Sequence, residues 1–283
     1  MNSVTVLGLG PMGRALAGAL LDAGRPVTVW NRTEAKADGV RARGVRWART
    51  PAEAVAASEL VLINVVDHAA LDSIVTSAGS SIAGRTIVGL SSDTPDRARR
   101  TAELVASANG RYLDGAIMTP TQTIGTADAS ILVAGPRELF ERHQPTIATL
   151  AAPTWVGDDY GRAAGFDMAL LGLFWTSVSG FLHALKVADA NGIAADELLP
   201  HALGIAEILP PILTELAERV RDDRHDDSAA PVSSVAASLR HLIAASRDAG
   251  IDPAALDAFR RSVDAAVGVG HGEDEISRVL AQL

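Results

Sequence analysis

Short apolar runs alternate with alanine-rich segments of helical character through the first half of the chain. Uninterrupted apolar runs of this length are typical of parallel strands that are buried on both faces. The runs are Val4–Leu7, Val27–Trp30, Leu60–Val66, Thr86–Leu90 and Ile131–Ala134, and a further strand is expected at Tyr112–Ala116. Helical segments such as Arg14–Ala23 lie between them, and Thr94-Pro95 has the form of a helix start. This alternation predicts an α/β domain with a doubly wound parallel sheet.

The strand pattern stops near residue 158, and only helical patterns follow. Residues 161–190 contain no proline and end at Asn191-Gly192, a pair suited to a left-handed C-cap. Further helices are predicted at Asp196–Leu209, Pro211–Arg221, Val232–Ala249 and Pro253–Val267, with an exposed polar loop at 222–231. We therefore predict an α/β domain at 1–160, a long interdomain helix at 161–191 and an all-α domain at 192–283.

The run from Met168 to Leu182 carries no charge and raises the question of a membrane span. A span needs about 20 apolar residues with anchors at its ends. This run is shorter, and Asp167, Lys186 and Asp189 lie close to it. Because a helix that is apolar all round also occurs inside large protein cores, we predict a buried helix and no membrane association.

Charge and composition exclude several classes of protein. The net charge of −9 argues against nucleic-acid binding, which needs a basic face. Without cysteine the chain has no disulfide, thiolate metal site or cysteine nucleophile, and the spacing of its histidines predicts no metal site. The first residues do not resemble a signal peptide, so a cytoplasmic location is expected. Only Lys36 and Lys186 are lysines among the 25 basic residues.

The first strand leads into a glycine-rich turn, Gly8-Leu9-Gly10-Pro11-Met12-Gly13. The spacing G-x-G-x-x-G between a strand and a helix is the fingerprint of a Rossmann-like dinucleotide site. Its glycines allow a tight turn, close approach of a pyrophosphate and close helix packing, and the helix N-terminus attracts the anion. A structural glycine turn without a ligand is the alternative.

The end of the second strand predicts which cofactor binds. An NAD site usually has an acidic residue there to hold the ribose hydroxyls. This chain has Asn31, Arg32 and Thr33, with Lys36 following, and no acid at the tip. Arg32 suits a 2′-phosphate, and Asn31 and Thr33 are able to hydrogen-bond. We therefore predict NADP(H), with a solvated basic turn as the alternative.

Other candidate residues follow later strands, because ligands of open α/β sheets bind beyond the carboxyl ends of the strands. For each of them, a role in a turn or a cap is the alternative. For the cofactor they are Val65, Val66, Ser91, Ser92 and Thr94, and for the substrate Met118 and Thr119.

Several segments together carry a family resemblance. They are GLGPMGRALAGALLDAG at 8–24, VWNRTEAKA at 29–37, DGAIMTPTQTIGT at 114–126, FDMALLGLFW at 166–175 and GHG at 270–272. The chain thereby resembles the NADPH-dependent imine reductases, relatives of the β-hydroxyacid and 6-phosphogluconate dehydrogenases. The resemblance implies reduction of a small imine by NADPH in a homodimer with exchanged helical domains.

The related dehydrogenases use a lysine near the start of the interdomain helix, and this chain has none between Lys36 and Lys186. Asp167 stands there instead, and the resemblance implies that it is a proton donor or an iminium anchor. Asp167 also begins an apolar helical stripe with Leu170, Leu171 and Phe174. A carboxyl group on such a stripe loses hydration, which favours a bound proton. The alternative is that Asp167 only begins the helix.

The remaining predictions concern the substrate pocket and competing functions. The pocket is predicted from Met118, Thr119, Met168, Leu171, Phe174 and Trp175, with Leu209, Leu213, His241 and Leu242 facing the partner's cleft. A dehydrogenase of hydroxyacids or aldehydes is the first alternative function, and the missing lysine disfavours it. A redox sensor that binds NADP(H) without turnover is the second.

Overall fold

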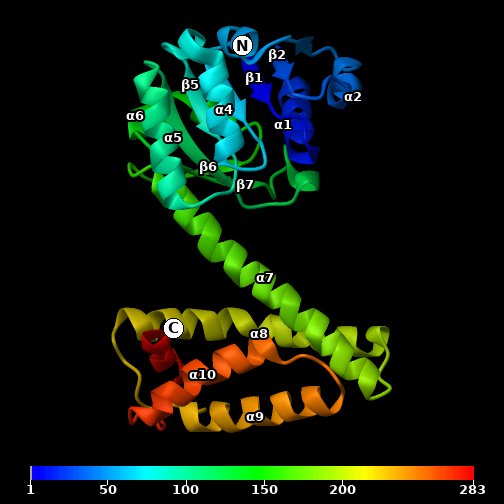
Figure 1. Ribbon diagram of the computed structural model, residues 1–283, viewed down its shortest axis with the longest axis vertical. Helices are drawn as coiled ribbons and strands as arrows, with labels where there is room; N and C mark the ends of the chain where they lie inside the picture. The colour runs from blue at the N-terminus through cyan, green and yellow to red at the C-terminus, as the bar shows by residue number, and fades with distance from the viewer. Residues whose placement is uncertain (1) are drawn as a thin grey trace. The chain divides into compact units, whose positions relative to one another are not determined.

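The computed structural model describes residues 2–283, which divide into two compact units (Figure 1). The first unit ends at Leu173 and the second runs from Phe174 to Leu283. The boundary lies inside the long helix α7, Gly161–Ala190, whose limits agree with the helix predicted from the sequence. The division into domains at residues 160 and 191 stays a prediction.

The first unit is built on one sheet of eight strands in the order β3-β2-β1-β4-β5-β6-β7-β8. The strands are β1 Val4–Leu7, β2 Val27–Trp30, β3 Arg46–Trp47, β4 Leu60–Ile63, β5 Thr86–Gly89, β6 Arg111–Ile117, β7 Ser130–Ala134 and β8 Ala152–Gly157. All neighbouring pairs are parallel except β6 and β7. The strand order reverses direction between β1 and β4, which makes the sheet doubly wound, as predicted.

The antiparallel pair β6 and β7 differs from the fully parallel sheet that the sequence predicts. Ile117 pairs with Ile131, and the connection between them holds only the short 3-10 helix η3, Thr121–Thr123. A parallel crossover needs a dozen or more residues and usually a helix. Because this connection contains no helix long enough to return the chain to the other end of the sheet, β7 runs back along β6.

Helices cover both faces of the sheet because alternate strand residues point to opposite faces. Val6 packs with α1 and α6, whereas Leu7 packs with α3, α4 and α5. Both layers contain fully buried aliphatic side chains, each worth roughly 1.5–3 kcal/mol relative to exposure. The helices are α1 Pro11–Asp22, α2 Asp38–Arg41, α3 Pro51–Ala56, α4 His68–Ala78, α5 Pro95–Ser107 and α6 Arg137–Ile147, with the 3-10 helices η1 Glu34–Ala37 and η2 Gly79–Ile82.

The second unit is entirely helical in its described residues. It contains the end of α7, then α8 Ala195–Arg221, α9 Val232–Asp248, α10 Ala254–Gly268 and the 3-10 helix η4 Ile276–Gln282. Its core lies between α9, α10 and η4, where Leu239, Val263 and Val279 are buried together (Figure 1). No residue of α8 is buried.

One sequence prediction in the second unit is wrong, and another holds except at one residue. Helices expected at Asp196–Leu209 and Pro211–Arg221 form the single helix α8. Its paired prolines remove two amide donors, yet their fixed φ fits a helix, and the Thr214 hydroxyl donates to the carbonyl oxygen of Pro210 at 2.9 Å. The polar loop at 222–231 is not wholly exposed, because His225 is buried and lies 2.8 Å from the Ser277 hydroxyl.

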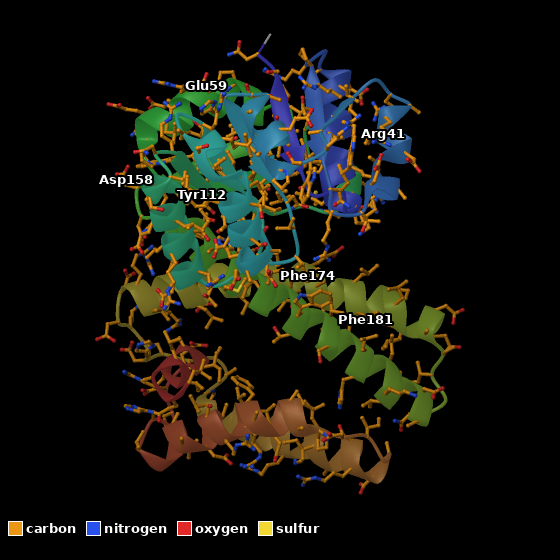
Figure 2. The ribbon with its side chains drawn as sticks, turned by 45° about the horizontal axis from the view of Figure 1, so that its top comes forward. Arg41, Glu59, Tyr112, Asp158, Phe174 and Phe181 are labelled. Atoms are coloured by element: carbon orange, nitrogen blue, oxygen red, sulfur yellow. The ribbon has the colours of Figure 1, made fainter. Side chains whose placement is uncertain are left out.

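The prediction that α7 is buried is also wrong for the part beyond Asp167. Leu170, Phe174, Trp175 and Leu182 are between 43% and 61% exposed. Figure 2 shows Phe174 and Phe181 as side chains on this helix. Helix α7 is the one described helix that is long and apolar enough to cross a membrane by length and composition. Its apolar surface therefore needs a partner outside the two cores described above.

Candidate active site

The glycine-rich turn between β1 and α1 is tightly packed at two glycines and open at the third. Gly8 has a φ of +94°, and a side-chain carbon there would overlap the carbonyl oxygen of Asn64. A side-chain carbon at Gly13 would overlap the carbonyl oxygen of Gly8. At Gly10 no atom lies within 4 Å of that position. The backbone at Gly10 is therefore open to a ligand, and larger residues at the other two positions would displace the turn.

The N-terminus of α1 leaves its first amide groups without a side-chain cap. Gly10 is the N-cap and Pro11 follows at the first helical position, ahead of Met12. Uncapped amides and the helix dipole together favour an anion at this point. Leu9 has a different role, because its side chain is buried and its amide donates to Asn31 Oδ1 at 2.9 Å. The turn thus has the shape and charge that a pyrophosphate group needs.

The end of β2 carries two cations that have no carboxylate partner within the described residues. Arg32 and Lys36 are exposed and form no ion pair there. The nearest acid in sequence, Glu34, forms an ion pair with Arg41 at 2.7 Å. Asn31, which the sequence analysis assigned to the cofactor, uses its amide group to hold the turn at Leu9 and the backbone of Thr33. Two exposed cations without a carboxylate partner among the described residues therefore lie at the end of β2.

The ends of β4 and β5 lie beside the turn and are tied together. The Val65 amide donates to the buried Ser91 hydroxyl at 3.2 Å, so Ser91 fixes the two strand ends. Val66 is 82% exposed, which is unusual for an apolar side chain and leaves it free to contact a ligand. Ser92 and Thr94 are also exposed, and Thr94 is the N-cap of α5.

Asp167 is positioned by the first turns of α7. Ala163 is fully buried against Ala116 on β6 and Ala134 on β7. Residues four positions apart lie on the same face of a helix, so Asp167 faces the same side as Ala163. Its exposed fraction is only 4%. A carboxyl group is therefore held inside the first unit, close enough to β6 for its charge to act on Asp114.

A second buried carboxyl group, Asp114 on β6, lies in the same region. The pKa of Asp114 is raised to about 7, mainly by burial and to a smaller extent by the charge of Asp167. Hydrogen bonds from the Tyr112 hydroxyl at 3.1 Å and the Ala164 amide at 3.2 Å oppose this shift. Asp114 was quoted from the sequence only as part of a family motif. A charged residue inside an otherwise apolar strand is the signal that could have identified it.

The residues predicted for the substrate pocket are divided between the two units. Met118, Thr119, Met168 and Leu171 belong to the first unit and are half-buried. The hydroxyl group of Thr119 is buried without a hydrogen-bond partner among the described residues. The other predicted residues lie in the second unit, where all are exposed, and are Phe174, Trp175, Leu209, Leu213, His241 and Leu242. Phe174 and Trp175 pack edge to face, with ring centres 5.1 Å apart.

Comparisons with known proteins agree over both units. Residues 3–157 match the NAD binding domain of 6-phosphogluconate dehydrogenase, and residues 159–283 match the C-terminal domain described as NADPH-dependent reductive aminase-like. The NADPH-dependent reductive aminase of Aspergillus oryzae is 30% identical, with 98% of this chain and 95% of the relative aligned.

Solved structures of similar proteins cover the chain almost completely. An imine reductase of Streptomyces aurantiacus has a TM-score of 0.94 and 34% identity, over 99% of this chain and 98% of the other. A reductive aminase of Aspergillus terreus in complex with NADPH and ethyl levulinate has a TM-score of 0.95 and 33% identity, over 99% of each chain.

Proposed function

The chain belongs to the family of NADPH-dependent reductive aminases and imine reductases, and from that premise we propose which of its residues carry the reaction. It is an NADPH-dependent oxidoreductase that reduces C=N bonds of small molecules to amines. The observation that carries the assignment of residues is a buried aspartate, Asp167, in a chain without lysine between Lys36 and Lys186.

The residues around the glycine-rich turn fit NADPH. We assign the pyrophosphate to the backbone of Gly10, Pro11, Met12 and Gly13, where the turn is open and the helix is uncapped. We assign the 2′-phosphate to Arg32 and Lys36, the two unpaired cations. When bound, NADPH supplies the hydride for the C=N carbon.

Further cofactor contacts are assigned to exposed groups at the strand ends. Val66 offers apolar contact, Val65 lies beside it, and Thr33, Ser92 and Thr94 present side chains to solvent beyond their strands. Asn31, Leu9 and Ser91 act indirectly, because their polar groups hold the turn and the strand ends in place.

Asp167 is assigned to the substrate nitrogen. A carboxylate in a site with little water attracts a cationic iminium group far more strongly than a neutral ketone. A protonated Asp167 would instead donate to a neutral imine. In both cases the carboxyl group distinguishes C=N from C=O, which a buried lysine would not do by charge attraction. The half-buried Met118, Thr119, Met168 and Leu171 supply the pocket walls from the same unit.

A homodimer is proposed to complete the site and cover the exposed apolar surface. Large apolar side chains are exposed along both α7 and α8, including Phe174, Trp175, Leu209 and Leu213. A soluble protein rarely leaves so many together without a partner surface. We propose that the helical domains exchange between two copies, so that Leu209, Leu213, His241 and Leu242 face the partner's cofactor cleft. We also propose the domain limits 1–160, 161–191 and 192–283, and a cytoplasmic location.

A substrate comparison tests the proposed function. NADPH consumption is followed with a cyclic imine such as a pyrroline, and in parallel with the ketone of the same ring size. NADP⁺ reduction is followed with a β-hydroxyacid. The proposal predicts turnover of the imine far above that of the ketone and none of the hydroxyacid. Turnover of the hydroxyacid alone would establish the dehydrogenase alternative, and cofactor binding without any turnover would establish the sensor.

A further inference from the structure

A chain of buried polar groups connects Asp114 with the surface through α4 and α5. Arg97 donates to Asp72 Oδ2 at 2.9 Å, and the Thr101 hydroxyl donates to Asp72 Oδ1 at 2.7 Å. His68 Nδ1 lies 2.8 Å from Thr101 Oγ1. On the other side of the ring, His68 Nε2 lies 3.8 Å from Asp114 Oδ1. Four groups are thus connected in sequence to the carboxyl group beside Asp167.

The direction of these hydrogen bonds determines which nitrogen of His68 carries the proton. Asp72 is paired with Arg97 and only accepts, so Thr101 gives its single hydroxyl proton to Asp72. Thr101 Oγ1 must then accept from His68, which places the ring proton on Nδ1. Burial lowers the pKa of His68 against the opposing charges of Asp93 and Asp72, so the ring is neutral.

Neutral His68 therefore presents a lone pair on Nε2 to Asp114. Nε2 is buried and has no hydrogen-bond partner among the described residues. The exposed fractions of His68 and Asp114 are 0% and 2%. If Asp114 were ionised, its Oδ1 would still accept from Tyr112, but Nε2 and Oδ1 would face each other at 3.8 Å as two buried acceptors with no proton between them, which is costly. A proton on Asp114, directed at Nε2, supplies the missing donor and leaves the ring neutral.

Other titratable groups around the pair do not remove this conflict. The Tyr112 hydroxyl donates a hydrogen bond to Asp114. Burial raises the pKa of Tyr112 and of the neighbouring Tyr160, so both side chains stay neutral. Asp93 accepts from two backbone amides and adds only negative charge. The positive charge of Arg97 is balanced by Asp72. The remaining charged group is Asp167, which opposes ionisation of Asp114.

We propose that Asp114 and His68 hold one proton between them, and that Asp114 thereby keeps the negative charge of the site on Asp167. This inference rests on the proposed role of Asp167 at the substrate nitrogen. Two ionised carboxylates in one buried site oppose each other, so a neutral Asp114 removes the repulsion. Asp167 then acts as an anionic anchor for an iminium cation. Asp114 has no assigned substrate contact and is a positioning residue.

Infrared spectroscopy tests the shared proton without substrate or cofactor. A protonated carboxyl group has a carbonyl stretching band that a carboxylate lacks. The complete protein is titrated from pH 5 to pH 8, and the acid band is expected to disappear as the pH rises through about 7. Asp114→Asn removes the band. Asp158→Asn is the matched control, because it makes the same change at an exposed carboxylate of the same unit, and it leaves the band unchanged (Figure 2).

A second variant tests the chain of polar groups at Thr101, on the side of His68 that faces away from Asp114. Thr101→Val removes the acceptor for His68 Nδ1, so the ring proton is free to move to Nε2 and donate to Asp114. Ionised Asp114 then gains a donor, and the acid band disappears at a lower pH than in the wild-type protein. An unchanged midpoint in Thr101→Val would overturn the proposal, even if Asp114→Asn fails to fold.

A pH profile relates the shared proton to the reaction. The wild-type kcat/KM for a cyclic imine is expected to change slope near pH 7, and Asp114→Asn is expected to lose that inflection while Asp158→Asn retains it. Absence of an acid band at every pH, or a band that Asp114→Asn does not remove, would overturn the inference. Failure of imine turnover would contradict the proposed function. The infrared result would still show separately whether Asp114 holds the proton.

Discussion

Replacing Asp114 by asparagine should make the pH dependence of stability smaller. The folded protein holds a proton at Asp114 up to a pKa of about 7, whereas the ordinary value is 3.8. A carboxyl group with a raised pKa contributes stability that is complete below the unfolded value and is lost as the pH rises through the folded value. Asparagine keeps the size and an acceptor for the Ala164 amide but does not titrate.

The size of the effect follows from the two pKa values. At pH 5 the folded Asp114 is protonated and the unfolded one is ionised, and at pH 8 both are ionised. The part of this range below the folded pKa, from pH 5 to about pH 7, covers about 2 pH units, which correspond to about 3 kcal/mol of unfolding free energy. The free energy of unfolding of Asp114→Asn minus that of the wild-type protein should therefore rise by about 3 kcal/mol from pH 5 to pH 8.

Urea unfolding followed by tryptophan fluorescence measures this difference. Three of the four tryptophans, Trp30, Trp47 and Trp155, lie in the first unit and report on the unit that contains Asp114, whereas Trp175 lies in the second. Protein concentration is kept fixed, because association of the proposed dimer would also stabilise the folded state. Asp158→Asn should give a difference from wild type that does not vary with pH. An equally constant difference for Asp114→Asn would refute the raised pKa and the argument built on it.

Three further predictions address the cofactor site and the partner surface. Arg32→Ala should weaken NADPH binding roughly 10-fold or more and NADH binding little, because only NADPH has the 2′-phosphate. Equal loss of affinity for both cofactors in a fluorescence titration would refute that contact. The control is Arg46→Ala, which removes a nearby cation paired with Glu53. Gly13→Ala should destabilise the first unit by about 1–3 kcal/mol in urea unfolding and abolish NADPH binding, because the added carbon overlaps the Gly8 carbonyl oxygen; unaltered binding would refute the tight turn. Leu213→Glu should convert the proposed dimer to a monomer in light scattering, and a wild-type mass would refute that interface.

Strands and the long helix were predictable because their apolar patterns are uninterrupted. The predicted Leu60–Val66 and the observed Leu60–Ile63 begin at the same residue, and the observed strand ends three residues earlier, just before Asn64, whose side chain donates to the carbonyl oxygen of Leu90. The edge strand Arg46–Trp47 has only two residues, which is too short for a pattern. Ala152–Gly157 contains a proline and alternates in exposure, so it reads poorly as a strand.

Some features of the site depend on contacts that are distant in sequence. Asn31 was expected at the cofactor, but its side chain holds Leu9, 22 positions away. Asp114 on β6 lies 3.8 Å from His68 on α4, and no local sequence pattern pairs these two residues. Asp167 and the glycine turn were predictable because a family motif and a strand-turn-helix context mark them. Contacts between residues that are far apart in the sequence could be identified only from the folded structure.

The most direct test of the account is the activity of Asp167→Asn toward a cyclic imine, measured with NADPH affinity in the same preparation. If Asp167 acts on the substrate nitrogen, kcat/KM should fall roughly 100-fold or more, as for loss of a charged or acid–base group in a catalytic site. The dissociation constant of NADPH should remain near the wild-type value, since the turn and Arg32 are untouched. Turnover at the wild-type level would contradict the account and remove Asp167 from the reaction.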